Sequence, residues 1–141
     1  VYKRQPYGEA LFNRCVYGVF DPVGYGADGK YGNEWDMTIW ISDRGIESGR
    51  LKDILIHEAA HAYSYLVLRG CVVPDGSSFR ELAHKRYGDE EHLADVFVLY
   101  YGGKWTNYDG RENIPIRDRS WMSNMIDYCN LYEEALATLS S

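Results

Sequence analysis

The sequence predicts a mixed α+β fold in which a small N-terminal sheet is followed by helices. The first third of the chain is rich in β-branched, aromatic and turn residues. Segment 51–69 then carries apolar residues at helical spacing, and the later segments combine capping residues with apolar helical stripes. With 141 residues, the chain is expected to form a single domain over 1–141 with its own core.

Two strands are expected before residue 42. Val16–Phe20 is short, β-branched and aromatic, which is typical of a strand. Trp35–Ile41 alternates between two sets of side chains, so it is expected to show one face to the core. Asp28-Gly29 between them is a hairpin-turn signal, which favours an antiparallel pair.

The first five residues, Val1–Gln5, resemble translated sequencing-adapter sequence, so we leave them out of the expected sheet. A natural basic strand end is the alternative. The resemblance of Val1–Gln5 to adapter sequence predicts an environmental, metagenomic origin, and a chain that starts with Val and not Met predicts a truncated N-terminus.

Four helices are expected after the strands. Their ranges follow from candidate caps and stops: Leu51–Arg69 with Ser48 as N-cap, a short helix from the Ser78–Glu81 capping box to Tyr87, a helix from Asp89 to Tyr101, and Ser120–Leu139. Between the last two, 104–117 reads as an irregular loop. The last helix is expected to turn inward Met122, Met125, Ile126, Cys129, Tyr132, Leu136 and Leu139.

Composition excludes several classes of function. The formal net charge of −6 disfavours nucleic acid as a partner. No apolar run is long enough to cross a membrane, and no secretory signal opens the chain.

The three cysteines, Cys15, Cys71 and Cys129, form no Cys-x-x-Cys pair. Three reduced thiols in a cytoplasmic protein are the expectation, and one disulfide with one free thiol is the alternative.

The sequence His-Glu-Ala-Ala-His at 57–61 lies inside the first expected helix. Four residues advance a helix by about 400°, so the imidazoles of His57 and His61 lie on one face and can reach the same metal ion. Glu58 lies beside that ion, where a carboxylate can take a proton from bound water. This spacing is typical of a zinc hydrolase, with Zn²⁺ held by the histidines and Glu58 as general base.

A zinc hydrolase needs a third protein ligand. Segment 91–97 reads EHLADVF, with Glu91 and Asp95 four residues apart on one helical face. This resembles the Glu-x-x-x-Asp arrangement of gluzincin metallopeptidases, and also the Glu-x-x-Ala-x-x-Phe pattern of ImmA/IrrE-type peptidases. The resemblance implies that Glu91 is the third zinc ligand and that Asp95 hydrogen-bonds the ligating His57. Asp95 also lies in an apolar run, where a carboxylate should be paired.

Two other residues on the same predicted helix remain alternatives for the third zinc ligand. His92 and then Glu90 rank after Glu91, and Glu90 is expected to face solvent. His84 on the preceding helix is expected to be a surface residue.

The resemblance implies a zincin-like fold and hydrolysis of a peptide or protein substrate. Trp35–Ile41 would be the edge strand that takes an extended substrate. Tyr87, Tyr108 and Arg111 are candidates for stabilising the oxyanion. A dedicated ImmA-like regulatory protease and a non-catalytic, zinc-stabilised binding or viral structural module are the alternatives. The sequence indicates no oligomeric state.

Overall fold

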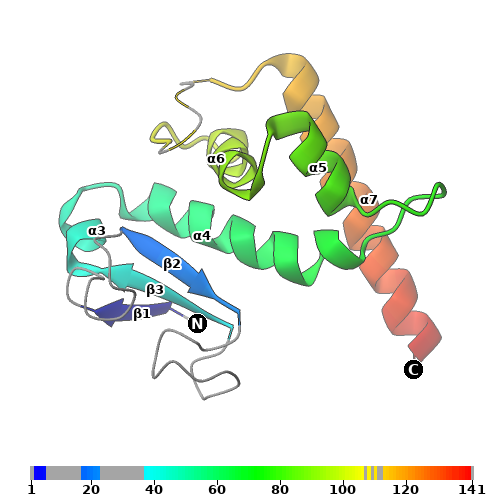
Figure 1. The fold of residues 1–141 in the computed structure, drawn as a ribbon, viewed down its shortest axis with the longest axis horizontal. Helices are drawn as coiled ribbons and strands as arrows, with labels where there is room; N and C mark the ends of the chain where they lie inside the picture. Colours follow the sequence, from blue (N-terminus) through cyan, green and yellow to red (C-terminus); the bar gives the residue numbers. More distant parts are fainter. Residues whose placement is uncertain are drawn as a thin grey trace. The chain divides into compact units, whose positions relative to one another are not determined.

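The computed structural model describes residues 2–5, 17–22, 37–106, 108, 110 and 113–140, the first four by backbone alone. The fold is mixed α+β, as predicted (Figure 1). The chain divides into two compact units, Val1–Ala62 and Tyr63–Ser141. Their boundary falls inside α4 (Leu51–Leu66), the helix that carries the histidine motif.

The first unit contains a three-stranded sheet with the order β1-β3-β2. β2 (Gly18–Asp21) pairs antiparallel with β3 (Thr38–Ser42), which confirms the expected antiparallel pair. β1 (Tyr2–Gln5) pairs parallel with the other side of β3, so leaving it out of the sheet was wrong. The prediction that Trp35–Ile41 forms an edge strand is also wrong, because β3 forms backbone pairs on both sides. Val16, Trp35, Asp36 and the Asp28-Gly29 turn lie outside the described residues.

A short helix, α3 (Asp43–Glu47), connects the sheet to α4. The predicted N-cap of α4, Ser48, is instead the C-cap of α3, where its hydroxyl donates to the Gly45 carbonyl at 2.6 Å. It cannot cap α4 because α4 begins three residues later. α4 ends at Leu66, before the predicted end, and a 3₁₀ turn, η1 (Leu68–Gly70), follows.

Local capping sets the start of α5 (Phe79–Tyr87) and of α6 (Glu90–Tyr100), as predicted. The Ser78 hydroxyl accepts from the Glu81 backbone N–H, and the Asp89 carboxylate accepts from the His92 backbone N–H. Every residue from Leu93 to Leu99 is buried, so α6 contributes more buried residues than α5 or α7.

A disulfide joins Cys71 and Cys129, so the prediction of three reduced thiols is wrong for this pair. Both side chains are fully buried and their Cα atoms lie 5.6 Å apart, within the range that a bridge requires. Closing a loop of 58 residues stabilises a fold by about 4 kcal/mol in the chain-entropy model. The prediction of a cytoplasmic protein is therefore no longer supported by three reduced thiols. Cys15 lies outside the described residues.

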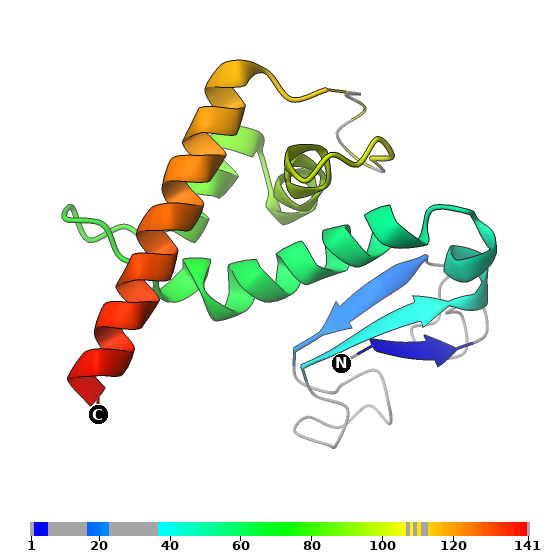
Figure 2. The same ribbon diagram turned by 180° about the vertical axis from the view of Figure 1, so that it is seen from behind.

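The last helix, α7 (Ile116–Ser140), crosses α5, and the view from behind shows α7 passing in front of it (Figure 2). At this crossing Arg86 donates two hydrogen bonds to Asp118, at 2.8 and 3.1 Å. The contact joins α5 to the first turn of α7 through a charge-assisted pair.

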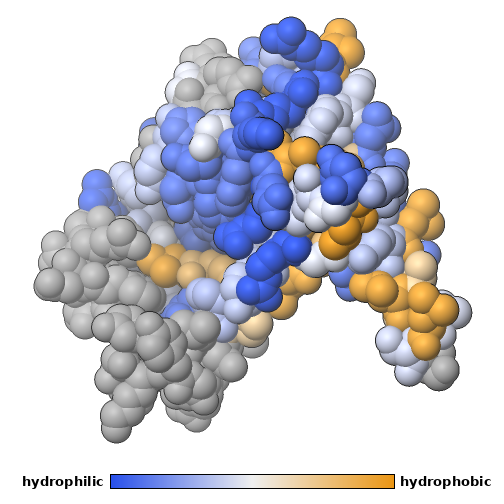
Figure 3. Space-filling view, turned by 45° about the vertical axis from the view of Figure 1, so that its right-hand side comes forward, coloured by the Kyte–Doolittle hydropathy of each residue, from blue (hydrophilic) through white to orange (hydrophobic). Residues whose placement is uncertain are grey.

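Only the first part of α7 reaches the core. Met122, Met125 and Cys129 are fully buried, whereas Leu136 is 42 % and Leu139 82 % exposed. The prediction that these two leucines point inward is wrong, because a helix of this length spans about 37 Å and its end runs past its shorter neighbours. Hydrophobic residues accordingly gather on its C-terminal end (Figure 3). None of the helices in the described part of the chain is long and apolar enough to cross a membrane.

Candidate metal centre

The histidine motif on α4 brings three potential metal-binding side chains together. The ligand atoms of His57, Glu58 and His61 lie within 4.8 Å of one another. His57 and Glu58 are each 6 % exposed, and His61 is half-buried. This group can therefore hold a metal ion, as the sequence predicts.

The two imidazoles are arranged as ligands of one ion would be. Their Nε2 atoms lie 3.1 Å apart, and the ring planes are inclined by 81°. Two nitrogens bound to one tetrahedral zinc at about 2.0–2.1 Å are separated by about 3.3 Å. The rings therefore need to move by only a few tenths of an ångström to share an ion. Imidazole donors suit zinc, copper, iron and nickel alike.

Glu58 is packed against the sheet of its own unit. A Cβ placed at Gly18 on β2 would lie 3.2 Å from Glu58 Cγ, 3.1 Å from Ile54 Cγ2 and 3.0 Å from Ile41 Cδ1. Gly18 thus allows β2 to approach the Glu58 side chain closely, and β2 lies alongside α4 in the ribbon view (Figure 1). The role of Gly18 was not predicted from the sequence, although a glycine inside a strand often marks a close approach.

The predicted Glu91 and Asp95 lie on α6, in the second unit, so their place in the metal site stays a prediction. Glu91 is half-buried in the first turn. Asp95 is fully buried, and its Oδ2 accepts the backbone N–H of Tyr108. The expectation that a carboxylate in this apolar run is paired is confirmed. Pairing of Asp95 with His57 stays a prediction.

The expectation that Glu90 faces solvent is wrong. Its Oε1 lies 2.7 Å from the Ser64 hydroxyl and 2.7 Å from His84 Nε2. Arg80 Nε approaches the same oxygen at 3.5 Å, and the Glu90 side chain is 24 % exposed. Sequence periodicity missed this cluster because its four members come from three helices.

His92, the rival ligand, is held by the cap of its own helix. Its Nδ1 lies 2.8 Å from Asp89 Oδ1, which also accepts the His92 backbone N–H. These two bonds hold the pKa of the Asp89 carboxyl below its usual range, so the cap stays ionised at neutral pH.

The three candidates for stabilising an oxyanion differ in their surroundings. The Tyr87 hydroxyl lies 3.5 Å from Asp118 Oδ1, beside the Arg86 guanidinium, in the contact between α5 and α7. Tyr108 is 50 % exposed. Arg111 lies outside the described residues.

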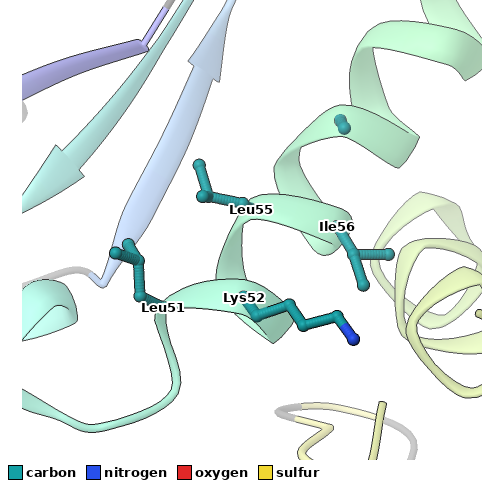
Figure 4. A pocket seen from close by; sticks show the side chains of 5 residues that line it. Leu51, Lys52, Leu55 and Ile56 are labelled. Carbon is teal, nitrogen blue, oxygen red and sulfur yellow. The ribbon is translucent and has the colours of Figure 1, made fainter. Parts of the chain in front are cut away.

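A shallow apolar hollow on α4 does not coincide with the metal-binding group. It is lined by Leu51, Lys52, Leu55, Ile56 and Ala59 (Figure 4). At about 100° per residue, these five centre on the side of the helix opposite His57 and His61. We therefore assign this hollow no part in the metal chemistry.

Comparisons with family models, curated proteins and solved structures find no match to this chain. The likeness to gluzincins consequently rests on the motif residues alone.

Proposed function

We propose that the chain is a zinc-dependent metallopeptidase with a zincin-like fold. The convergence of the two Nε2 atoms of His57 and His61, with a buried carboxylate beside them, carries the proposal. Two neutral imidazoles and one carboxylate are the ligand set of many catalytic zinc sites, which keep a fourth position open. In this proposal Glu91 is the carboxylate ligand.

Three observations favour Glu91 over its neighbours as the third ligand. Glu90 Oε1 already binds Ser64 and His84, and His92 Nδ1 is held by Asp89. Asp95, four residues after Glu91, is a buried carboxylate of the kind that orients a ligating imidazole. We propose that Asp95 accepts the Nδ1–H of His57, which fixes the tautomer whose Nε2 lone pair would bind the metal.

When bound, zinc supplies Lewis-acid activation of water and of the substrate carbonyl. Glu58 takes the proton that the attacking water loses and passes it to the leaving amine. Because Glu58 and His57 are buried, bulk water is kept from the reacting atoms, which strengthens the electrostatic interactions there.

The proposal is tested on protein purified without added metal. We expect about one zinc per chain by mass spectrometry, and hydrolysis of casein or a peptide library that 1,10-phenanthroline abolishes and zinc restores. Zinc without hydrolysis of any peptide would indicate a non-catalytic module. Hydrolysis that survives complete removal of the metal would contradict the proposal.

Gly18→Ala tests how closely Glu58 must be placed. The new methyl group would lie 3.0–3.2 Å from side-chain atoms of Ile41, Ile54 and Glu58, so Glu58 must shift. We expect peptide hydrolysis to fall by about tenfold, zinc content to persist, and stability to fall by about 1–3 kcal/mol.

Gly70→Ala is the matched control, because a Cβ at Gly70 meets no atom within 4 Å. It should leave hydrolysis and the thermal midpoint unchanged. Wild-type turnover in Gly18→Ala would show that the strand does not position Glu58.

A further inference from the structure

One carboxylate oxygen on α6 lies within hydrogen-bond distance of side chains from two other helices. Glu90 Oε1 on α6 lies 2.7 Å from Ser64 Oγ on α4, and 2.7 and 3.5 Å from His84 Nε2 and Arg80 Nε on α5. Arg80 Nε also donates to Ser64 Oγ at 3.1 Å. We call these four residues the Glu90 cluster.

The cluster is partly shielded from water, which strengthens its bonds. Ser64 is fully buried, and the side chains of Arg80, His84 and Glu90 are 30 %, 31 % and 24 % exposed. Hydrogen bonds to a charged group in such surroundings are stronger than neutral ones. Arg80 and His84, four residues apart, reach Glu90 from one face of α5.

The place of the cluster in the chain connects it to the proposed metal site. Ser64 follows His61 by three residues on the same helix, and Glu90 immediately precedes Glu91. Glu90 is the first residue of α6, so its bonds fix the rotation of that helix at the end that carries Glu91. A rotation of about 10° would displace a glutamate carboxylate by about 1 Å, more than a metal site tolerates.

We propose that Glu90 is a positioning residue, which fixes the rotation of α6 within the second unit and thereby the direction of the Glu91 carboxylate. The inference rests on the proposed function. Glu90 binds no metal itself: its bonds to Ser64 on α4 and to Arg80 and His84 on α5 hold α6 in the rotation that presents the neighbouring carboxylate. The apolar residues of α6 keep the helix packed. The hydrogen bonds of the Glu90 cluster then select one rotation of α6 about its own axis.

Cobalt(II) tests this, because its visible absorption reports the number and geometry of its ligands. We expect Glu90→Ala and Ser64→Ala each to lower cobalt affinity by about tenfold or more and to change the absorption band. Glu90→Gln keeps an oxygen that accepts from Ser64, so it should retain most of the affinity. Circular dichroism confirms that each variant is folded.

Asp118→Asn is the matched control. It weakens the pair between Arg86 and the buried Asp118 carboxylate, which joins α5 to α7 in the same unit. We expect it to lower the thermal midpoint while leaving cobalt affinity and the band unchanged. An equal affinity loss in Asp118→Asn, or wild-type affinity and band in Glu90→Ala and Ser64→Ala, would overturn the positioning role.

His57→Ala separates this inference from the proposed function. If wild-type protein binds one cobalt and His57→Ala does not, the histidine site stands and the cluster variants alone decide the inference. Cobalt bound equally by wild type and His57→Ala would overturn both.

Discussion

We expect His57→Ala and His61→Ala each to lose stoichiometric zinc. The two Nε2 atoms lie 3.1 Å apart, so one ion can use both rings. A structural zinc contributes about 10–16 kcal/mol through four ligands, so the loss of one ligand corresponds to about 10²–10³-fold in affinity. Metal analysis after dialysis against a weak chelator measures the loss.

His92→Ala is the control for the zinc content of His57→Ala and His61→Ala. Its ring is held by Asp89 at the start of α6, so we expect its zinc content to match that of wild type. If His57→Ala and His61→Ala both retain one zinc per chain, the metal is bound elsewhere and the peptidase proposal fails. If His92→Ala loses the zinc as His57→Ala and His61→Ala do, His92 and not Glu91 is the third ligand.

Features that depend on neighbours along the chain could be predicted from the sequence. The Ser78 and Asp89 caps involve residues three positions apart, and the 57–61 motif forms within little more than one turn of α4. In each case the helix itself brings the interacting groups together. The motif histidines could therefore be identified before their surroundings were known.

Features that depend on segments far apart in the chain could not be predicted. The Glu90 cluster joins Ser64 to a residue 26 positions later, and the disulfide joins cysteines 58 positions apart. A helical pattern identifies which face of α6 is polar, but not that Arg80 and His84 approach it. Likewise, the apolar stripe of α7 predicts a buried face but not where the opposing surface ends, which left Leu136 and Leu139 exposed.

The proposed role of Glu58 differs from that proposed for the histidines, and one substitution separates the two. Its side chain is buried against β2, with Gly18 beside its Cγ. Glutamine has the same size and shape, so it fits this space without moving the strand. It cannot accept the proton that an attacking water must lose.

Glu58→Gln should therefore retain one zinc per chain and the wild-type thermal midpoint, yet lose peptide hydrolysis by several orders of magnitude. The expected loss is large because the same carboxylate removes a proton from water and then delivers it to the leaving amine, and each transfer contributes about 10²–10⁴-fold. Zinc content, the thermal midpoint and kcat/KM on one peptide are measured on the same preparations. Equal hydrolysis by both proteins would point to a contaminating protease, whereas a parallel loss of zinc would make Glu58 a metal ligand and leave the general base unassigned.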